Sequence, residues 1–389
     1  MKELNLDFSH TLKYFIGVII VITIIGLICL YSSSYMYARD NFSSSYYLIS
    51  KQLISLAMGI IGAFIISKTR FTFWYHNSLK FHLLTSLLVL LTFIPKIGLS
   101  IKGSHRWVNL RFMSIQPGEF LKFSVLLTAL YFFENYKNFS KDTKIIYLLS
   151  ILAPLGLTVL QPDFGTFTLC FSLIFFLAFL SKVPRSYLIG SLAVGSVAFV
   201  ALLVAAPYRV KRLMSFLDPW ADPQNSGFQI IQSYLAFAEG SLFGKGLGAS
   251  VEKLFYLPEA YNDFILSVIG EELGFVGVAV IATLFLIFLY LGFKLASQSK
   301  VNAGKIFIAG YTFLISLQAF LNMGIVLGLL PTKGLNLPFV SYGGSSLLCN
   351  LIGLGLIISL QRYQQGANSE KEFLYKENTQ LRKYSTKVA

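Results

Sequence analysis

Long apolar stretches alternate with shorter polar segments along most of this chain. Because an α-helix needs about 20 consecutive apolar residues to cross the hydrocarbon core of a bilayer, each stretch predicts a transmembrane helix. The pattern therefore predicts an all-α polytopic membrane protein, a bundle of about ten transmembrane helices. The predicted spans are residues 12–31, 46–67, 81–99, 115–134, 144–161, 164–182, 186–206, 264–293, 304–330 and 340–361.

One polar segment between these spans is too long to be a simple connection. It covers about residues 207–262, between the seventh and eighth predicted helices, with prolines early and glycines late. Loops of this length without a function are uncommon, and we expect short amphipathic helices within it, lying at the membrane interface. We expect residues 1–362 to form one membrane domain and residues 363–389 to form a basic, disordered tail.

Composition agrees with the hydropathy pattern. Of the 389 residues, 55% are hydrophobic and 13% are charged, and the mean hydropathy is +0.66. A soluble protein of this size cannot bury so much apolar surface. The three cysteines lie in apolar spans and are expected to be packing residues, and the four histidines are too scattered for a zinc site. The first span has no cleavage site after it, so we expect a retained anchor.

The formal net charge of +14 would suggest nucleic-acid binding in a soluble protein. In a membrane protein the better explanation is topology, because cytoplasmic loops collect Lys and Arg. With ten spans and a cytoplasmic N-terminus, more than half of the basic residues fall in cytoplasmic segments. We therefore expect both termini in the cytoplasm, residues 207–262 outside, and no nucleic-acid partner.

Charged side chains inside a membrane span are costly, so each marks a candidate functional residue. Glu119 and Lys122 follow Gln116 at the start of the fourth span and lie on one helical face, three residues apart. They form either a structural ion pair or a phosphate-binding lysine that is oriented by the carboxylate. Asp163, just before the sixth span, is either a helix cap or a second residue of a site.

Two basic patches fall on the predicted outer side. One contains Arg106 beside Trp107, in the segment 100–114, and the other contains Arg209 and Arg212. Because Lys and Arg usually collect on the cytoplasmic side, these patches favour anion binding over solvated loops. Arginine binds phosphate groups through two parallel hydrogen bonds, so a pyrophosphate is the expected ligand.

Two glycine-containing motifs have less specific implications. Lys245 lies between two glycines, but the spacing of a nucleotide-binding loop is absent there. The last span begins with small residues, which either allow close helix packing or line a sugar or lipid site. These small residues are Ser341, Gly343, Gly344 and Ser345.

Asp263 is the most informative residue of the sequence. It ends the long loop and stands immediately before the eighth span, so it places a carboxylate at the membrane face. Together with the basic residues of the loop, it suits chemistry on an anionic, lipid-linked substrate. Capping of the eighth helix is the rival explanation.

Seven short strings in this chain resemble, in the same order, the SEDS family (shape, elongation, division and sporulation). The resemblance covers about residues 12–362 and is closer to the division member of the family than to the elongation member. The strings are GSHRWV (103–108), QPGEFLK (116–122), QPDFGT (161–166), GFQIIQS (227–233), PEAYNDFI (258–265), GEELGF (270–275) and PFVSYGGSS (338–346).

The resemblance implies a peptidoglycan glycosyltransferase that polymerises lipid II at the outer face of the cytoplasmic membrane, with inversion, during septal wall synthesis. It implies that Asp263 is the catalytic carboxylate and that Gln229, Glu259 and Lys245 belong with the substrate-binding residues. The implied partners are a class B penicillin-binding transpeptidase, other division proteins and membrane lipid. No organic cofactor is implied, and a divalent cation, magnesium or manganese, is compatible with the pyrophosphate leaving group.

Two other functions fit the same residues, and the chain departs from the family in two places. A lipid II flippase would also carry charges inside the membrane, and a division scaffold would need no catalytic residue. Gly118 stands where the family usually has Ser, and Tyr261 and Asn262 stand where it usually has His and Thr. The second departure bears on any role of a neighbouring histidine and leaves Asp263 unchanged.

Overall fold

The computed structural model describes residues 2–101, 104–109, 114–181, 183–184, 186–190, 193, 195, 207–225, 227–254, 257–258, 260–332 and 334–365. Most of these residues belong to long helices that form one bundle. The helices of the bundle are α1 (Lys2–Phe42), α2 (Tyr47–Lys68), α4 (Ser78–Leu91), α5 (Pro117–Asn135), α6 (Lys141–Leu160), α7 (Phe164–Leu180), α11 (Ile265–Gln298), α12 (Asn302–Val326) and α13 (Gly344–Gln365). The shorter helices are α3 (Phe71–His76), α9 (Pro207–Leu217), η1 (Pro219–Ala221) and α10 (Phe228–Gly240).

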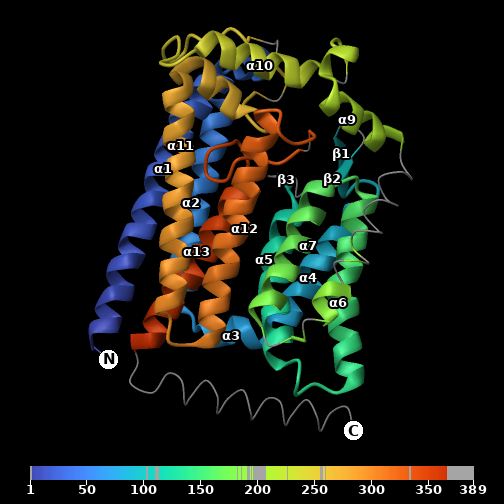
Figure 1. Cartoon of the computed structure of the whole chain (residues 1–389), viewed down its shortest axis with the longest axis vertical. Coiled ribbons are helices and arrows are strands. Elements are labelled where there is room, and N and C mark those ends of the chain that lie inside the picture. Colours follow the sequence, from blue (N-terminus) through green and yellow to red (C-terminus); the bar gives the residue numbers. More distant parts are fainter. Residues whose placement is uncertain are drawn as a thin grey trace.

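The bundle has two groups of helices. Figure 1 shows α1, α2, α11, α12 and α13 on one side and α4, α5, α6 and α7 on the other. Contacts of α12 with α5 and α7, and of α13 with α5, join the two groups, so α5 and α12 are largely buried. Helices α9 and α10 lie across the end of the bundle opposite the N-terminus (Figure 1). We call this end the loop end.

The helix surfaces are those of a membrane protein. Within the described ranges, six helices are long and apolar enough to cross a membrane, and α4 and α7 are shorter apolar helices. The outward side chains of α2 are apolar, and Ile54, Ile61 and Phe64 are 59–62% exposed. Exposed apolar side chains of this kind are favourable in contact with lipid and unfavourable in contact with water. The predicted all-α, multi-pass fold is confirmed, although the predicted span 186–206 and the tail beyond Gln365 lie largely outside the described residues.

The long loop contains short helices, as predicted. Helix α9 is strongly amphipathic, and its sequence alternates basic residues with Val210, Leu213, Met214 and Leu217. Helix α10 packs against α11, and Ser233 Oγ donates to Val326 O of α12 at 2.6 Å. The loop is therefore a folded cover on the loop end.

The predicted helix over 81–99 is wrong in its second half. Helix α4 ends at Leu91, the chain turns, and Gly98–Ile101 forms β1, which pairs with β2 (Ser104–Asn109). The two residues of β3 (Ser114–Ile115) pair with β2 on its other side. A Cβ at Gly98 would lie 1.8 Å from the carbonyl oxygen of Thr92, so only glycine allows this turn. The segment 100–114 thus belongs to a small sheet, which the all-α prediction missed.

Two further helix ends differ from the predicted spans. Helix α12 ends at Val326 instead of residue 330, because Gly328 has a φ of 68° and packs directly against the side chain of Tyr234. Helix α11 extends to Gln298 and is broken at Gly274, whose φ is 66°. Both breaks use a conformation that glycine adopts without steric cost.

Candidate active site

The site lies at the loop end, where five parts of the chain meet. They are the N-termini of α5 and α7, the strand β2, the residues before α11, and the segment 331–343 between α12 and α13.

Asp263 is held by its backbone. Its carbonyl oxygen accepts a hydrogen bond from Nδ2 of Asn322 in α12 at 2.8 Å, and the preceding carbonyl oxygen, of Asn262, accepts one from Ser341 Oγ at 2.6 Å. The side chain of Asp263 is partly exposed, and its Oδ2 would lie 3.1 Å from a Cβ placed on Gly334. The N-cap residue of α11 is Phe264, whose side chain cannot cap, so N-capping does not explain Asp263.

Arg106 reaches the same place from β2. Its Nη2 donates to the carbonyl oxygen of Pro162, and its Nη1 lies 4.0 Å from Oδ1 of Asp163. The same Nη1 would lie 3.6 Å from a Cβ on Gly334, with 23% of the Arg106 side chain exposed. The carboxylate of Asp263 and the guanidinium of Arg106 therefore both border Gly334.

Asp163 is a helix cap, which is one of the two roles that the sequence predicts for it. It is the N-cap of α7, accepting hydrogen bonds from the backbone nitrogen of Thr166 at 3.2 Å and from its Oγ1 at 2.8 Å. The residue is 3% exposed. The carboxylate of Asp163 also lies 4.0 Å from Nη1 of Arg106, so its charge helps to orient the guanidinium.

Glu119 and Lys122 are paired, as predicted, and lie deeper in the bundle. Lys122 Nζ is 2.7 Å from Oε2 of Glu119, and the two side chains are 2% and 7% exposed. The same Nζ donates to Gln318 Oε1 at 2.7 Å, and Gln318 Nε2 donates to Asn336 Oδ1 at 2.6 Å. The pair is thus linked through α12 to the segment 331–343 that borders Asp263.

The small residues at the start of α13 fix this segment. Nε2 of Gln52 donates to the carbonyl oxygen of Ser341 at 3.3 Å, and the backbone nitrogen of Gly343 donates to Gln52 Oε1 at 3.1 Å. The backbone nitrogen of Gln116 donates to Ser345 Oγ at 3.1 Å. A Cβ on Gly344 would collide with Ser55 of α2, so this glycine permits close packing. These contacts favour a supporting role over a lining role.

Several other predicted site residues lie away from Asp263, or their side chains fall outside the described residues. Lys245 pairs with Glu239 and, at 3.2 Å, with Glu271, in a second charged cluster. Trp107 is half-buried in β2 and Gln229 is half-buried in α10. Arg209 and Arg212 lie in α9, but their side chains are outside the described part of the structure, as is Glu259.

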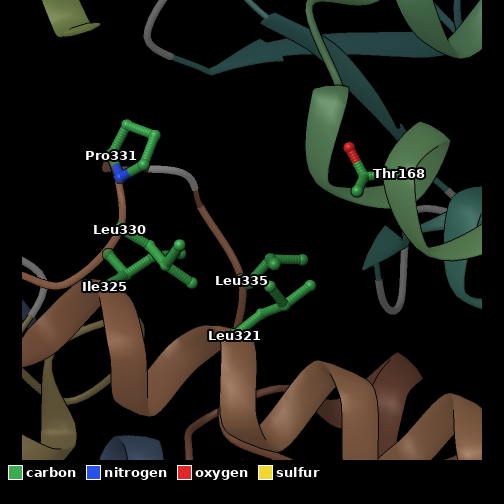
Figure 2. A pocket seen from close by; sticks show the side chains of 6 residues that line it. All are labelled: Thr168, Leu321, Ile325, Leu330, Pro331 and Leu335. Carbon is green, nitrogen blue, oxygen red and sulfur yellow. The ribbon is translucent and has the colours of Figure 1, made fainter. Parts of the chain in front are cut away.

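An apolar cavity of about 60 Å³ lies beside the site. Figure 2 shows Thr168 of α7 on one side and the leucines of α12 and the following loop on the other. The lining residues are Thr168, Leu321, Ile325, Leu330, Pro331 and Leu335. The carbonyl oxygen of Leu335, which lines the cavity, accepts a hydrogen bond from Asn322. Asn322 also donates to the carbonyl oxygen of Asp263, so one side chain positions both the cavity wall and the backbone of Asp263.

Sequence reasoning missed the amides that build this site. Gln52, Gln318 and Asn322 are 1–3% exposed and lie inside transmembrane helices. A buried amide in a membrane helix is costly without hydrogen-bond partners. The presence of these amides in predicted spans could therefore have marked them as candidate site residues. Gly334 could not be recognised as a site residue from the sequence, because its position beside Asp263 depends on how the segment 331–343 folds back. Across the described residues, no group of three or more His, Cys, Asp and Glu side chains is arranged to hold a metal ion.

Residues 12–366 match the model of the cell cycle protein family that comprises FtsW, RodA and SpoVE, and the chain belongs to this family. It is 36% identical to the probable peptidoglycan glycosyltransferase FtsW of Geobacter sp. (strain M18), over 90% of this chain and 96% of that one. It is 37% identical to the stage V sporulation protein E of Bacillus subtilis (strain 168), over 88% and 94% of the two chains. The resemblance noted from the sequence is thereby confirmed.

Two solved structures share the fold. A structure described as "Structural coordination of polymerization and crosslinking by a peptidoglycan synthase complex" has a TM-score of 0.73 and 26% sequence identity, covering 90% of this chain and 98% of that one. The crystal structure of the Thermus thermophilus rod shape determining protein RodA has a TM-score of 0.65 and 23% identity, covering 90% and 97%. The second likeness concerns the fold alone.

Proposed function

We propose that this peptidoglycan glycosyltransferase polymerises lipid II at the outer face of the cytoplasmic membrane during septal wall synthesis, with Asp263 as general base. The observation that carries the proposal is the convergence of the Asp263 carboxylate and the Arg106 guanidinium on Gly334. A base and a cation that border the same residue supply what transfer of a sugar from a pyrophosphate requires. The family relatives named as glycosyltransferases support the reaction class.

The reaction is a single displacement. Asp263 takes the proton of the acceptor 4-hydroxyl as that oxygen bonds to C1 of the donor MurNAc, and the bond from C1 to the pyrophosphate oxygen breaks. Undecaprenyl pyrophosphate leaves with the bonding electron pair. One base and a good leaving group suit direct displacement, whereas a covalent route needs a second carboxylate as nucleophile. Inversion turns the α-linked donor into a β-linked polymer.

The leaving group needs positive charge, and the lipid chain needs an apolar surface. Arg106 provides positive charge at the site, and the sequence of α9, at the loop end, is basic. The apolar cavity between α7 and α12 has room for a few methylene groups of a chain. A site with both features suits an anionic, lipid-linked substrate.

A class B penicillin-binding transpeptidase is the proposed partner, because the similar synthase complex combines polymerization with crosslinking. The septal role rests on the relatives named FtsW. The decisive experiment mixes purified protein with lipid II in detergent, with and without the transpeptidase. Glycan strands are the expected product. A flippase would yield none, since detergent offers no two sides to transport between.

Replacing Arg106 by Ala is expected to weaken lipid II binding. The side chain is mostly buried and hydrogen-bonded, and losing one partner of such a charge pair typically costs about 2–5 kcal/mol, with the lower end fitting a partly exposed group. That cost corresponds to about a thirtyfold rise in Kd, measured by titration of labelled lipid II. His105→Ala, an exposed neighbour in β2, is the control and should leave Kd unchanged. Equal Kd values for both variants would assign Arg106 a purely structural role.

The loop end is expected to face outward, with both termini in the cytoplasm. Gln224, before α10, is exposed at the loop end, and Lys141, at the start of α6, is exposed at the other end. All three native cysteines are buried, so a single introduced cysteine gives the signal. Gln224→Cys should react with an impermeant thiol reagent in intact spheroplasts, and Lys141→Cys should react only after lysis. The reverse pattern would overturn the orientation and the extracytoplasmic reaction.

A further inference from the structure

A second cluster of charged side chains lies at the loop end, outside the active site. Its centre is a pair of adjacent carboxylates in α11, Glu271 and Glu272, whose side chains are 0% and 2% exposed. A buried carboxylate is costly unless it is paired and hydrogen-bonded. The loop 241–254 supplies most of the hydrogen-bond and ion-pair partners of Glu271 and Glu272. The burial of both carboxylates therefore depends on the position of that loop against α11.

Glu271 gathers four donors from this loop. It accepts hydrogen bonds from Ser250 Oγ at 2.5 Å and from the backbone nitrogens of Val251 at 2.7 Å and Glu252 at 3.3 Å. Lys245 Nζ lies 3.2 Å from its Oε1. Burial, together with the charge of Glu271, raises the pKa of Glu252 to about 7. One carboxylate thus fixes three consecutive residues of the loop.

Glu272 points to a different set of partners. Its Oε1 lies 2.5 Å from Nζ of Lys253, which is 1% exposed. Ser32 Oγ, on α1, donates to both oxygens of Glu272, at 2.8 and 2.7 Å. The two adjacent carboxylates therefore tie α11 to the loop and to α1.

The break in α11 makes this attachment mechanically important. At Gly274 the helix is interrupted, and the loop backbone replaces the missing hydrogen bonds: Phe275 N donates to Ser241 O at 2.9 Å, and Gly246 N donates to Glu272 O at 2.9 Å. A Cβ on Gly244 would lie 2.2 Å from the same carbonyl oxygen, so the loop sits directly in the break. Residues 265–273 are therefore a separate short helix, which we call the outer half-helix.

The outer half-helix connects the cluster to the base. It begins immediately after Asp263 and Phe264 and ends at Glu271 and Glu272, a distance of about 13 Å at 1.5 Å per residue. At its first end, the carbonyl oxygen of Asp263 is held by Asn322. A short helix fixed at both ends moves as one body, so a shift at the carboxylates changes the position of Asp263.

We propose that Glu271 and Glu272 are positioning residues that hold the outer half-helix against loop 241–254 and thereby set the place of Asp263. The inference rests on the proposed role of Asp263 as general base. A displacement of about 1 Å at a reacting group can cost about 100-fold in rate without loss of binding. The positioning residues therefore act on turnover and leave substrate affinity unchanged.

The test is a double-mutant cycle on the purified full-length protein, assayed for lipid II polymerisation with its transpeptidase. Glu271→Gln should lower kcat by about 100-fold and leave KM within about threefold. In an Asp263→Asn background the same substitution should cause almost no further loss, because there is no base left to position. The residual rate in that background is measured with radiolabelled lipid II over long incubations.

A milder variant and a control distinguish an effect on positioning from a general loss of folding. Ser250→Ala removes one hydrogen bond to Glu271, leaves its charge in place, and should show the same dependence on Asp263 with a several-fold loss. Asp142→Asn changes an exposed carboxylate in the first turn of α6, outside the cluster, and should leave kcat unchanged. If Glu271→Gln does not fold, the Ser250→Ala cycle decides.

Two results would overturn the inference in different ways. Equal fold losses in the natural and Asp263→Asn backgrounds would show a general structural role and overturn the inference alone. High activity of Asp263→Asn by itself would overturn the proposed function, and the inference with it.

Discussion

Asp263→Asn is expected to insert into the membrane, bind lipid II, and polymerise it about 10²–10⁴-fold more slowly than the natural chain, the range that general base catalysis contributes. Asn has nearly the size of Asp and cannot accept the acceptor proton. The structural contact of this residue to Asn322 uses the backbone carbonyl, which the substitution leaves in place. The loss should therefore appear in kcat, measured under saturating lipid II.

Asp218→Asn provides the matched control. This aspartate lies at the same end of the molecule, is exposed, and caps η1 by accepting a hydrogen bond from the backbone nitrogen of Trp220. Because Asn also caps well, the control should retain its rate. A purified Asp263→Asn protein that makes glycan at more than about a tenth of the natural rate would contradict the base assignment.

Asp263 and Arg106 are predicted as site residues from the sequence because local rules make both positions anomalous. A carboxylate directly before an apolar span and an arginine on the predicted outer side each need an explanation. The structure brings both to Gly334. The prediction did not need the tertiary structure, since each anomaly is visible within a few residues.

The rest of the site depends on contacts between distant segments. Asn322 donates to the carbonyl oxygens of Asp263 and Leu335, which are far from each other in the chain. Pattern reasoning assigns Asn322 to a span but cannot assign its partners. The small sheet was missed for a related reason: residues 98–101 are apolar enough for a helix, and the turn before them depends on the contact between Gly98 and Thr92.

Lys122→Ala is expected to abolish polymerisation and to lower the thermal stability of the protein. The substitution leaves Glu119 buried without its cation, and breaking a buried pair in this way typically costs about 3–5 kcal/mol. It also removes the hydrogen bond to Gln318, which continues to Asn336 in the segment beside Asp263. Stability alone therefore does not separate the structural role of Lys122 from a role in the site.

The double substitution Glu119→Gln with Lys122→Met separates these roles, because it removes both charges and keeps similar volumes. Replacing a buried ion pair by neutral groups of similar size is often neutral for stability. We expect the double variant to regain the melting temperature of the natural chain in detergent and to remain inactive, since neither new side chain replaces the cation that Gln318 contacts. If polymerisation returned together with stability, Glu119 and Lys122 would be a structural pair only.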